Sequence, residues 1–231
     1  NHNIHLYKNN LDKLEEYRLN FNKKKLFNFS EFNKFIEYIK DYGTITFANS
    51  ARIGFISENF LRSFSSQQLL TDKRIEEFKN SIVTVLGEFV HDTNDLIKKK
   101  ISWKNFKEIY GHLRSGTYDI TSNRYDNSKY FKHLKIKSEI KYFKKKFFKL
   151  TNAEQEKINK EIKKHKLEIN AEQLINFISS NISFREYSKF IFTKSLSDLL
   201  EKIAIKGKMI NLSREDLSFL SFKDLSLLDN K

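Results

Sequence analysis

Apolar residues recur every three or four positions along most of this chain, as they do on helices that bury one face. This spacing predicts helices over residues 4–21, 72–99 and 103–110, and a further helix that begins at Ser30. Residues 44–64 are apolar almost all round, which predicts a central, buried helix. The sequence contains no repeat, no flexible linker and no alternation of strands with helices. It therefore predicts an all-α fold, a compact domain of many helices.

The C-terminal third carries a series of helix-capping signals. A serine or threonine stands three positions before a glutamate or aspartate, as in a capping box, at four places: Thr151, Ser183, Ser213 and Ser221. Ser183 is expected to begin a long helix with one apolar side. Gly207 is expected to end it, because glycine is the usual residue just past a helix.

Between these two helical regions, residues 111–130 are polar and contain two of the six glycines, so we expect an irregular loop there. Residues 130–150 mix aromatic residues and lysines without a clear period. We treat residues 1–231 as one helical domain, and allow for two sub-lobes over 1–130 and 131–231.

Composition narrows the class of protein. Hydrophobic residues make up 39% of the chain and include 22 Phe, which is enough for a substantial core. The absence of cysteine excludes disulfides and thiolate metal sites, and favours a cytoplasmic location. No apolar run approaches the roughly 18 residues that a membrane span needs. The chain does not begin with Met, so we expect a fragment of a longer protein.

The formal net charge of +14 has two interpretations. It can indicate a nucleic-acid or anionic partner. It can also reflect compositional drift, since lysines are spread over exposed helix faces and the chain has no proline. We favour drift. Because this chain uses lysine so much more often than arginine, an arginine indicates a position where the planar guanidinium group is required for a specific contact. This reasoning selects Arg52, Arg62, Arg114, Arg124 and Arg185.

The polar break after residue 110 is the best candidate for chemistry. Gly111 can end a helix in the left-handed conformation, and Gly116 can permit a turn with positive φ. On a structural interpretation, Asp119 then caps the next segment. On a functional one, His112, Arg114 and Arg124 donate hydrogen bonds to a phosphate or carboxylate, and Asp119 orients an arginine or accepts from a substrate hydroxyl. Residue types alone leave both open. No phosphate-binding glycine loop, dinucleotide fingerprint or metal-binding pattern is present.

Three stretches resemble one protein family. Residues 110–126 read YGHLRSGTYDITSNRYD and resemble the YGHLRPGTYDI…RYDE signature of phosphoenolpyruvate-synthase-like proteins, a group related to rifampicin phosphotransferase. Residues 42–63, YGTITFANSARIGFISENFLRS, are similar to a helix of the same proteins. Residues 185–220, which begin REYSKFIFTKSLSDLL and end LSREDLSFL, are similar to their C-terminal ending. The three stretches occur in the expected order.

This resemblance implies a helical middle domain of an ATP-dependent phosphotransferase of the dikinase type. Such proteins also have an ATP-grasp domain and a swivelling domain, whose histidine carries the phosphoryl group from ATP to a second substrate. The expected partners are these two domains of the same polypeptide and a small phosphoryl acceptor. ATP and Mg²⁺ would serve the full-length protein, and no cofactor is expected on this fragment. Both other domains' motifs are absent here, so the fragment alone should not catalyse the reaction.

The resemblance also assigns residues to a site. It implies substrate-binding roles for His112, Arg114, Asp119 and Arg124, with Arg52 and Arg185 as second-line candidates on flanking helices. The loop itself would be shaped by Tyr110, Gly111, Gly116, Thr117 and Tyr118. Ser115 departs from the signature, where proline is usual. No catalytic or metal-binding residue is expected. The alternatives are a nucleic-acid-binding helical domain, which the sequence argues against, and a structural adaptor.

Overall fold

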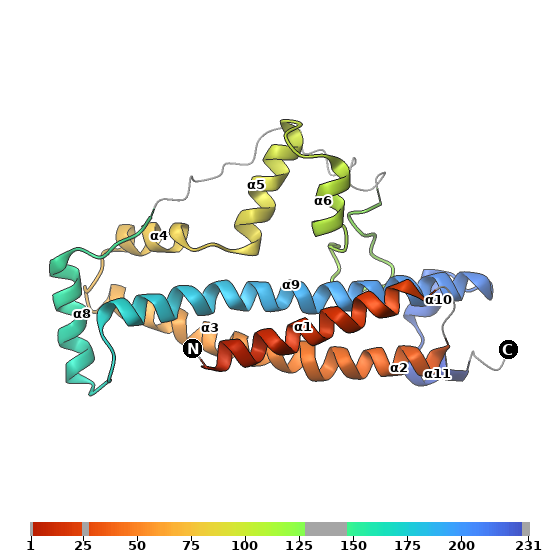
Figure 1. Ribbon diagram of the computed structural model, residues 1–231, viewed down its shortest axis with the longest axis horizontal. Coiled ribbons are helices and arrows are strands. Elements are labelled where there is room, and N and C mark those ends of the chain that lie inside the picture. The colour runs from red at the N-terminus through yellow and green to blue at the C-terminus, as the bar shows by residue number, and fades with distance from the viewer. Residues whose placement is uncertain (1, 25–27, 128–146, 228–231) are drawn as a thin grey trace. The chain divides into compact units, whose positions relative to one another are not determined.

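The computed structural model describes residues 2–24, 28–127 and 147–227 (Figure 1). These residues form helices without a sheet, which confirms the predicted all-α class. Within these three ranges, no helix is both long and apolar enough to cross a membrane. The helices are α1 (His2–Lys23), α2 (Phe29–Tyr38), the π-helix η1 (Ile39–Thr44), α3 (Ile45–Ser66), α4 (Asp72–Ser81), α5 (Val85–Ile97), α6 (Trp103–Tyr110), α8 (Asn152–Lys164), α9 (Ala171–Met209), α10 (Arg214–Ser218) and α11 (Phe222–Leu227).

The chain divides into two units that interleave along the sequence. Unit 1 comprises Asn1–Phe47, Phe89–Ile140 and Ser188–Lys231, and unit 2 comprises Ala48–Glu88 and Lys141–Tyr187. Helices α3 and α9 each contribute one part to each unit. Neither unit therefore coincides with the sub-lobes over 1–130 and 131–231. The boundary between those sub-lobes, and the last residues of the predicted loop, lie outside the described residues.

Each unit has its own hydrophobic core. In unit 1, aromatic residues of α1 and α2 pack with aliphatic residues of α9; Phe21, Phe35 and Leu199 are each 3% exposed or less. In unit 2, the end of α3 packs with α8 and the first half of α9, and Ile158, Leu174 and Ile178 are almost fully buried there. In both units the buried residues follow the helical spacing of the sequence.

Several predicted helices are confirmed, with changes at their ends. Residues 4–21 lie in α1, and 103–110 coincide with α6. Residues 44–64 are helical as α3, but Phe55 and Ile56 are 63% and 49% exposed, so this helix is not buried all round.

Two other predicted helices have different boundaries. Helix α2 begins after Asn28, whose side chain forms a capping box with Glu31, and Ser30 lies within the first turn. Residues 72–99 form two helices, because the chain becomes extended at Ile82, where ψ is 130°.

Three of the four capping boxes are confirmed. Thr151 and Ser213 each exchange hydrogen bonds with the acidic residue three positions on, and Ser221 does the same with Asp224. The prediction for Ser183 is wrong. Helix α9 begins twelve residues earlier, where Asn170 and Gln173 exchange hydrogen bonds between side chain and backbone.

Four helices end in Schellman motifs in which the left-handed residue is not glycine. The residues with positive φ are Gln68, Lys99, Lys166 and Asn211, at the ends of α3, α5, α8 and α9. In each case the next residue's N–H donates to a carbonyl five positions back, as the motif requires. No described glycine has positive φ. Gly207 accordingly lies inside α9, and a methyl group there would lie 2.5 Å from Leu217 Cδ1. The prediction that Gly207 ends this helix is wrong.

Candidate functional site

The loop after α6 is held closed by its own backbone. Leu113 accepts a hydrogen bond from the Tyr125 N–H at 2.8 Å, and Gly111 accepts one from the Asp126 N–H at 3.0 Å. Arg114 and Arg124 form an isolated antiparallel bridge between the two sides. The loop therefore has a defined local structure, and this brings two of the predicted arginines together.

The two glycines of the loop permit close packing instead of positive φ. Gly111 is right-handed, with φ −59° and ψ −26°, so the predicted left-handed cap is wrong. A Cβ atom at Gly111 would lie 2.3 Å from the Lys107 carbonyl oxygen and 3.0 Å from Asp126 Cβ. At Gly116 the predicted positive φ is also absent, and a Cβ atom would lie 2.9 Å from Asp119 Cβ. At both positions a side chain is excluded by atoms that are near in sequence, the last turn of α6 at Gly111 and the following turn at Gly116.

Arg114 is a buried cation that ties the loop to α9. Its side chain is only 1% exposed. Nη2 donates to Glu201 at 2.8 Å and to the Ser197 hydroxyl at 3.1 Å, and Nη1 donates to the Asp119 carbonyl at 3.1 Å. Burial lowers the pKa of Arg114, partly offset by Glu201. The Ser197 hydroxyl in turn donates to the His112 carbonyl at 2.7 Å.

Arg124 makes a second buried connection to α9. Its Nη1 donates to Asp198 at 2.8 Å, and its Nη2 pairs with Asp126 at 3.0 Å. The other Asp198 oxygen accepts from Arg18 at 2.5 Å and from Asn22 at 2.6 Å, both on α1. Burial alone would raise the pKa of Asp198, but the adjacent arginines outweigh it and hold that pKa below its usual value.

Glu201 connects the same network to α10. One of its oxygens accepts from Arg114, and the other accepts from Arg214 at 2.5 Å. Arg214 also donates to the Ile120 carbonyl at 2.7 Å, so a second point of the loop is fixed. Glu15 joins the same network through an ion pair with Arg18 at 2.5 Å. We call this set the arginine network, and it consists of Glu15, Arg18, Arg114, Arg124, Asp126, Asp198, Glu201 and Arg214.

His112 is a buried, neutral imidazole close to this network. It is 3% exposed, and its ring packs edge-on against Phe190 with the centroids 4.6 Å apart. Neither ring nitrogen has a hydrogen-bond partner among the residues that the structure describes. Burial, followed by the charges of Lys194 and Arg124, lowers the pKa of His112 to about 3. The side chain therefore carries no charge at neutral pH.

The remaining loop residues have mixed environments. The Asp119 carboxylate is exposed and accepts from the Thr121 N–H at 2.8 Å and the Thr121 hydroxyl at 2.7 Å, which is the geometry of a turn cap. Tyr110 is buried and donates to Asp92 at 2.9 Å. Tyr118 is 63% exposed, and Thr117 is half-buried.

Arg52 and Arg185 do not belong to this cluster of contacts, because both lie in unit 2. Arg52 is exposed and donates to Asn49 at 3.3 Å. The stem of Arg185 packs where Gly54 lacks a side chain; a Cβ atom there would lie 2.8 Å from Arg185 Cδ. Arg62 is likewise exposed on α3, in unit 2.

Six of the eight network residues lie outside the set predicted from sequence: Glu15, Arg18, Asp126, Asp198, Glu201 and Arg214. Arg18 and Arg214 are arginines in a chain that prefers lysine, just as the selected arginines are. The same argument could therefore have identified both. Asp198 and Glu201 stand three positions apart on α9, so they share a face. Nothing in the sequence distinguishes them from solvated acids.

Chemically, the arginine network can hold the loop, and its buried guanidinium groups are already engaged by carboxylates. In the part of the chain that is described, no group of three or more His, Asp or Glu residues could hold a metal ion. No family model, curated protein or solved structure matches this chain.

Proposed function

We propose that this chain is the helical domain of an ATP-dependent phosphotransferase of the phosphoenolpyruvate-synthase-like type, and that it presents the loop to the second substrate. The ATP-grasp and phosphohistidine domains would lie elsewhere in the full-length polypeptide. The basis is the resemblance of residues 42–63, 110–126 and 185–220 to that family.

The observation that carries the proposal is that residues 185–220 contact both of the other stretches within unit 1. Gly43 packs against Phe192, where a Cβ atom would lie 2.9 Å from the ring. Arg114 pairs with Glu201, 87 positions away, and Arg214 bonds to the Ile120 carbonyl. If the three stretches belong to the signature of one fold, residues in different stretches are expected to contact one another although they lie far apart in the sequence.

The geometry gives the loop residues different roles within this proposal. Arg114 and Arg124 hold the loop on α9, and His112 is buried against Phe190 of the same helix. Among the loop residues assigned to the site from sequence, Tyr118 and Asp119 have exposed side chains, and these can meet a phosphoryl acceptor. Arg52 and Arg185 remain second-line candidates for substrate binding.

The test is a turnover assay on the full-length polypeptide that contains this chain. With ATP and Mg²⁺, ³¹P NMR should show AMP and inorganic phosphate, and an acid-labile phosphohistidine should accumulate without acceptor. If ADP is the only nucleotide product, or if ATP is not consumed, the proposal is wrong.

The role of the loop is tested by Tyr118→Ala in the same protein. We expect ATP cleavage and phosphohistidine formation to be unchanged, and transfer to the acceptor to fall roughly tenfold or more, as for loss of a positioning contact. Phe219→Ala is the matched control, because Phe219 is 80% exposed in unit 1 but lies outside the loop. Equal transfer rates for the two variants would remove the loop from the acceptor site.

A further inference from the structure

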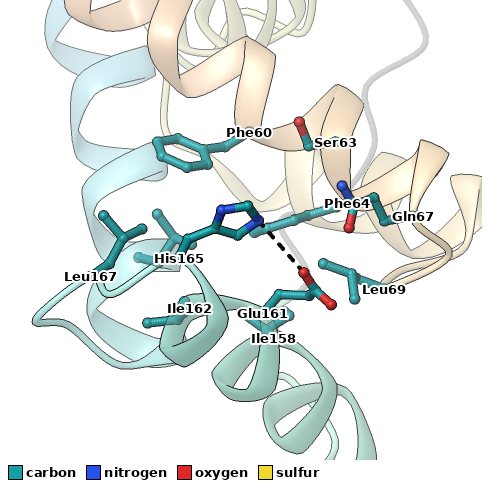
Figure 2. Close-up of a pocket in the computed structure, with 11 residues that line it drawn as sticks. Phe60, Ser63, Phe64, Gln67, Leu69, Ile158, Glu161, Ile162, His165 and Leu167 are labelled. Carbon is teal, nitrogen blue, oxygen red and sulfur yellow. Dashed lines mark ion pairs between the residues drawn. The ribbon is translucent and has the colours of Figure 1, made fainter.

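Unit 2 contains a pocket formed by two of the Schellman motifs. At the end of α3, the Leu69 N–H donates to the Phe64 carbonyl at 2.9 Å, and at the end of α8 the Leu167 N–H donates to the Ile162 carbonyl at 3.1 Å. Each motif folds its last apolar residue back over the helix. All four of these side chains line the same pocket (Figure 2).

The pocket has an apolar body of about 310 Å³. This volume lies at the lower end of the range for small-molecule sites, about 300–1,000 Å³. Two aromatic rings and several aliphatic side chains line it: Phe60, Phe64, Leu69, Ile158, Ile162, Leu167 and Leu174. The walls are firm, since Phe64, Ile158 and Leu174 belong to the unit 2 core and are at most 3% exposed.

Four polar residues also line the pocket, and we call them its rim. Ser63 and Gln67 lie on the α3 side, and Glu161 and His165 face them from the end of α8 (Figure 2). Glu161 Oε2 is 3.7 Å from His165 Nε2 and 3.2 Å from Lys164 Nζ. A carboxylate offers about four acceptor positions, so Glu161 can accept from a ligand while it keeps these partners.

An apolar body with a carboxylate at its rim selects one kind of ligand. A ring of one or two fused cycles suits the volume and the two phenylalanines. A hydroxyl or amino group on that ring needs a hydrogen-bond acceptor once it leaves water. The carboxylate of Glu161 offers one at the rim.

We propose that this pocket binds a small aromatic molecule with one hydrogen-bond donor, and that Glu161 accepts from that donor. The proposal does not rest on the phosphotransferase assignment, because every lining residue belongs to unit 2 and the loop belongs to unit 1. It assigns a binding site only and no reaction.

The test uses the full chain and two probes that differ in one donor. 2-Naphthol carries a hydroxyl group, and 2-methoxynaphthalene has the same ring without a donor. We expect titration calorimetry to show 2-naphthol binding with a Kd below about 1 mM. The methoxy compound should bind roughly tenfold more weakly, the effect of one charge-assisted hydrogen bond. Glu161→Gln keeps an acceptor oxygen but loses the charge, so it should reduce this discrimination to roughly threefold. Unchanged discrimination in this variant would contradict the role of Glu161.

The site is located by a pair of matched variants on α3. Ser63→Tyr places a ring in the rim and should abolish binding, whereas Ser66→Tyr, an equally exposed position that does not line the pocket, should leave it unchanged. Circular dichroism would check that both variants are folded. Should Ser63→Tyr fail to fold, methyl NMR shifts of Ile162 and Leu167 on adding 2-naphthol report the same location.

Three results would overturn the proposal. One is the absence of 2-naphthol binding at about 1 mM. Another is equal binding of the two probes to the unmodified chain. The third is binding that persists in Ser63→Tyr, or that shifts methyl groups only outside the pocket.

Discussion

Arg124 and Asp198 form a buried ion pair, with 2.8 Å between Nη1 and Oδ1 and with side chains only 14% and 10% exposed. The second oxygen of Asp198 accepts from Arg18 on α1. One carboxylate on α9 therefore holds both the loop and the first helix. Removing one member of such a pair leaves an uncompensated buried charge, which costs more than the pair itself contributes.

Asp198→Ala should therefore be among the most destabilising single changes in unit 1. It leaves Arg18 and Arg124 without their shared partner, and we expect the free energy of unfolding to fall by about 3–5 kcal/mol. Urea denaturation followed by circular dichroism measures this. The control is Glu37→Gln, which removes an exposed pair with Lys40 and should cost under about 1 kcal/mol. Similar losses for the two variants would contradict a structural role for the network.

His112 should make the stability of the chain depend on pH in a defined window. The unfolded chain protonates this histidine near its ordinary pKa of 6.5, whereas burial lowers the folded pKa to about 3. Between these values the unfolded state binds more protons, so stability falls as the pH falls, by up to about 1.4 kcal/mol per pH unit. Unfolding curves from pH 6.5 to 4.5 measure this slope.

The matched variant for this prediction is His112→Leu, which cannot titrate and has no ring nitrogens to satisfy. At pH 7 it should be as stable as the unmodified chain or more so, and it should lose most of the slope below pH 6.5. His5→Gln, at an exposed position, should keep the slope. An unchanged slope in His112→Leu would mean that another group causes the pH dependence.

Gly111→Ala tests whether the loop requires close packing. The added Cβ would overlap the Lys107 carbonyl oxygen, a backbone atom that cannot move without disturbing α6. We expect a loss of about 1–3 kcal/mol, the usual cost of overpacking. Gly87→Ala is the control, because its nearest neighbour is the Thr84 hydroxyl at 3.3 Å, and it should change stability by under about 1 kcal/mol. Equal effects at the two glycines would contradict the predicted overlap.

The fold class could be predicted from sequence because helical periodicity and capping residues are local signals. Thr151 and Ser213 cap helices for reasons contained in four consecutive residues. The beginning of α9 could not be predicted in the same way. Ser183 fits the capping pattern, but it lies inside α9, which extends on both sides of this residue. The pattern at Ser183 shows that a capping motif is compatible with a helix interior.

The loop illustrates a second limit of sequence. The sequence singled out Arg114 and Arg124, but it contains no information on what they pair with, since Glu201 and Asp198 lie 87 and 74 positions away. Glycine is a further example. Its positions predict positive φ, yet in this chain atoms of Lys107 and Asp119 occupy the space beside Gly111 and Gly116, and the left-handed residues are elsewhere.

Those left-handed residues give the last prediction. Lys166 and Gln68 have φ of 55° and 54°, a conformation that costs a residue with a Cβ roughly 1–2 kcal/mol relative to glycine. Lys166→Gly and Gln68→Gly should therefore each raise the free energy of unfolding, by about 1 kcal/mol after allowing for the greater entropy of glycine in the unfolded chain. Thermal and urea denaturation measure the change.

Lys157→Gly is the control for the α8 substitution, because Lys157 is equally exposed but lies within the helix, where glycine should cost about 1 kcal/mol. Opposite signs for Lys166→Gly and Lys157→Gly are the expected result.

Gln68→Gly and Lys166→Gly also test the pocket, since the lining residues Leu69 and Leu167 directly follow these two left-handed residues. If the backbone keeps its left-handed turn, 2-naphthol affinity should stay within about twofold while stability rises. A loss of stability in Lys166→Gly would show that the lysine side chain stabilises α8 by more than its backbone strain costs.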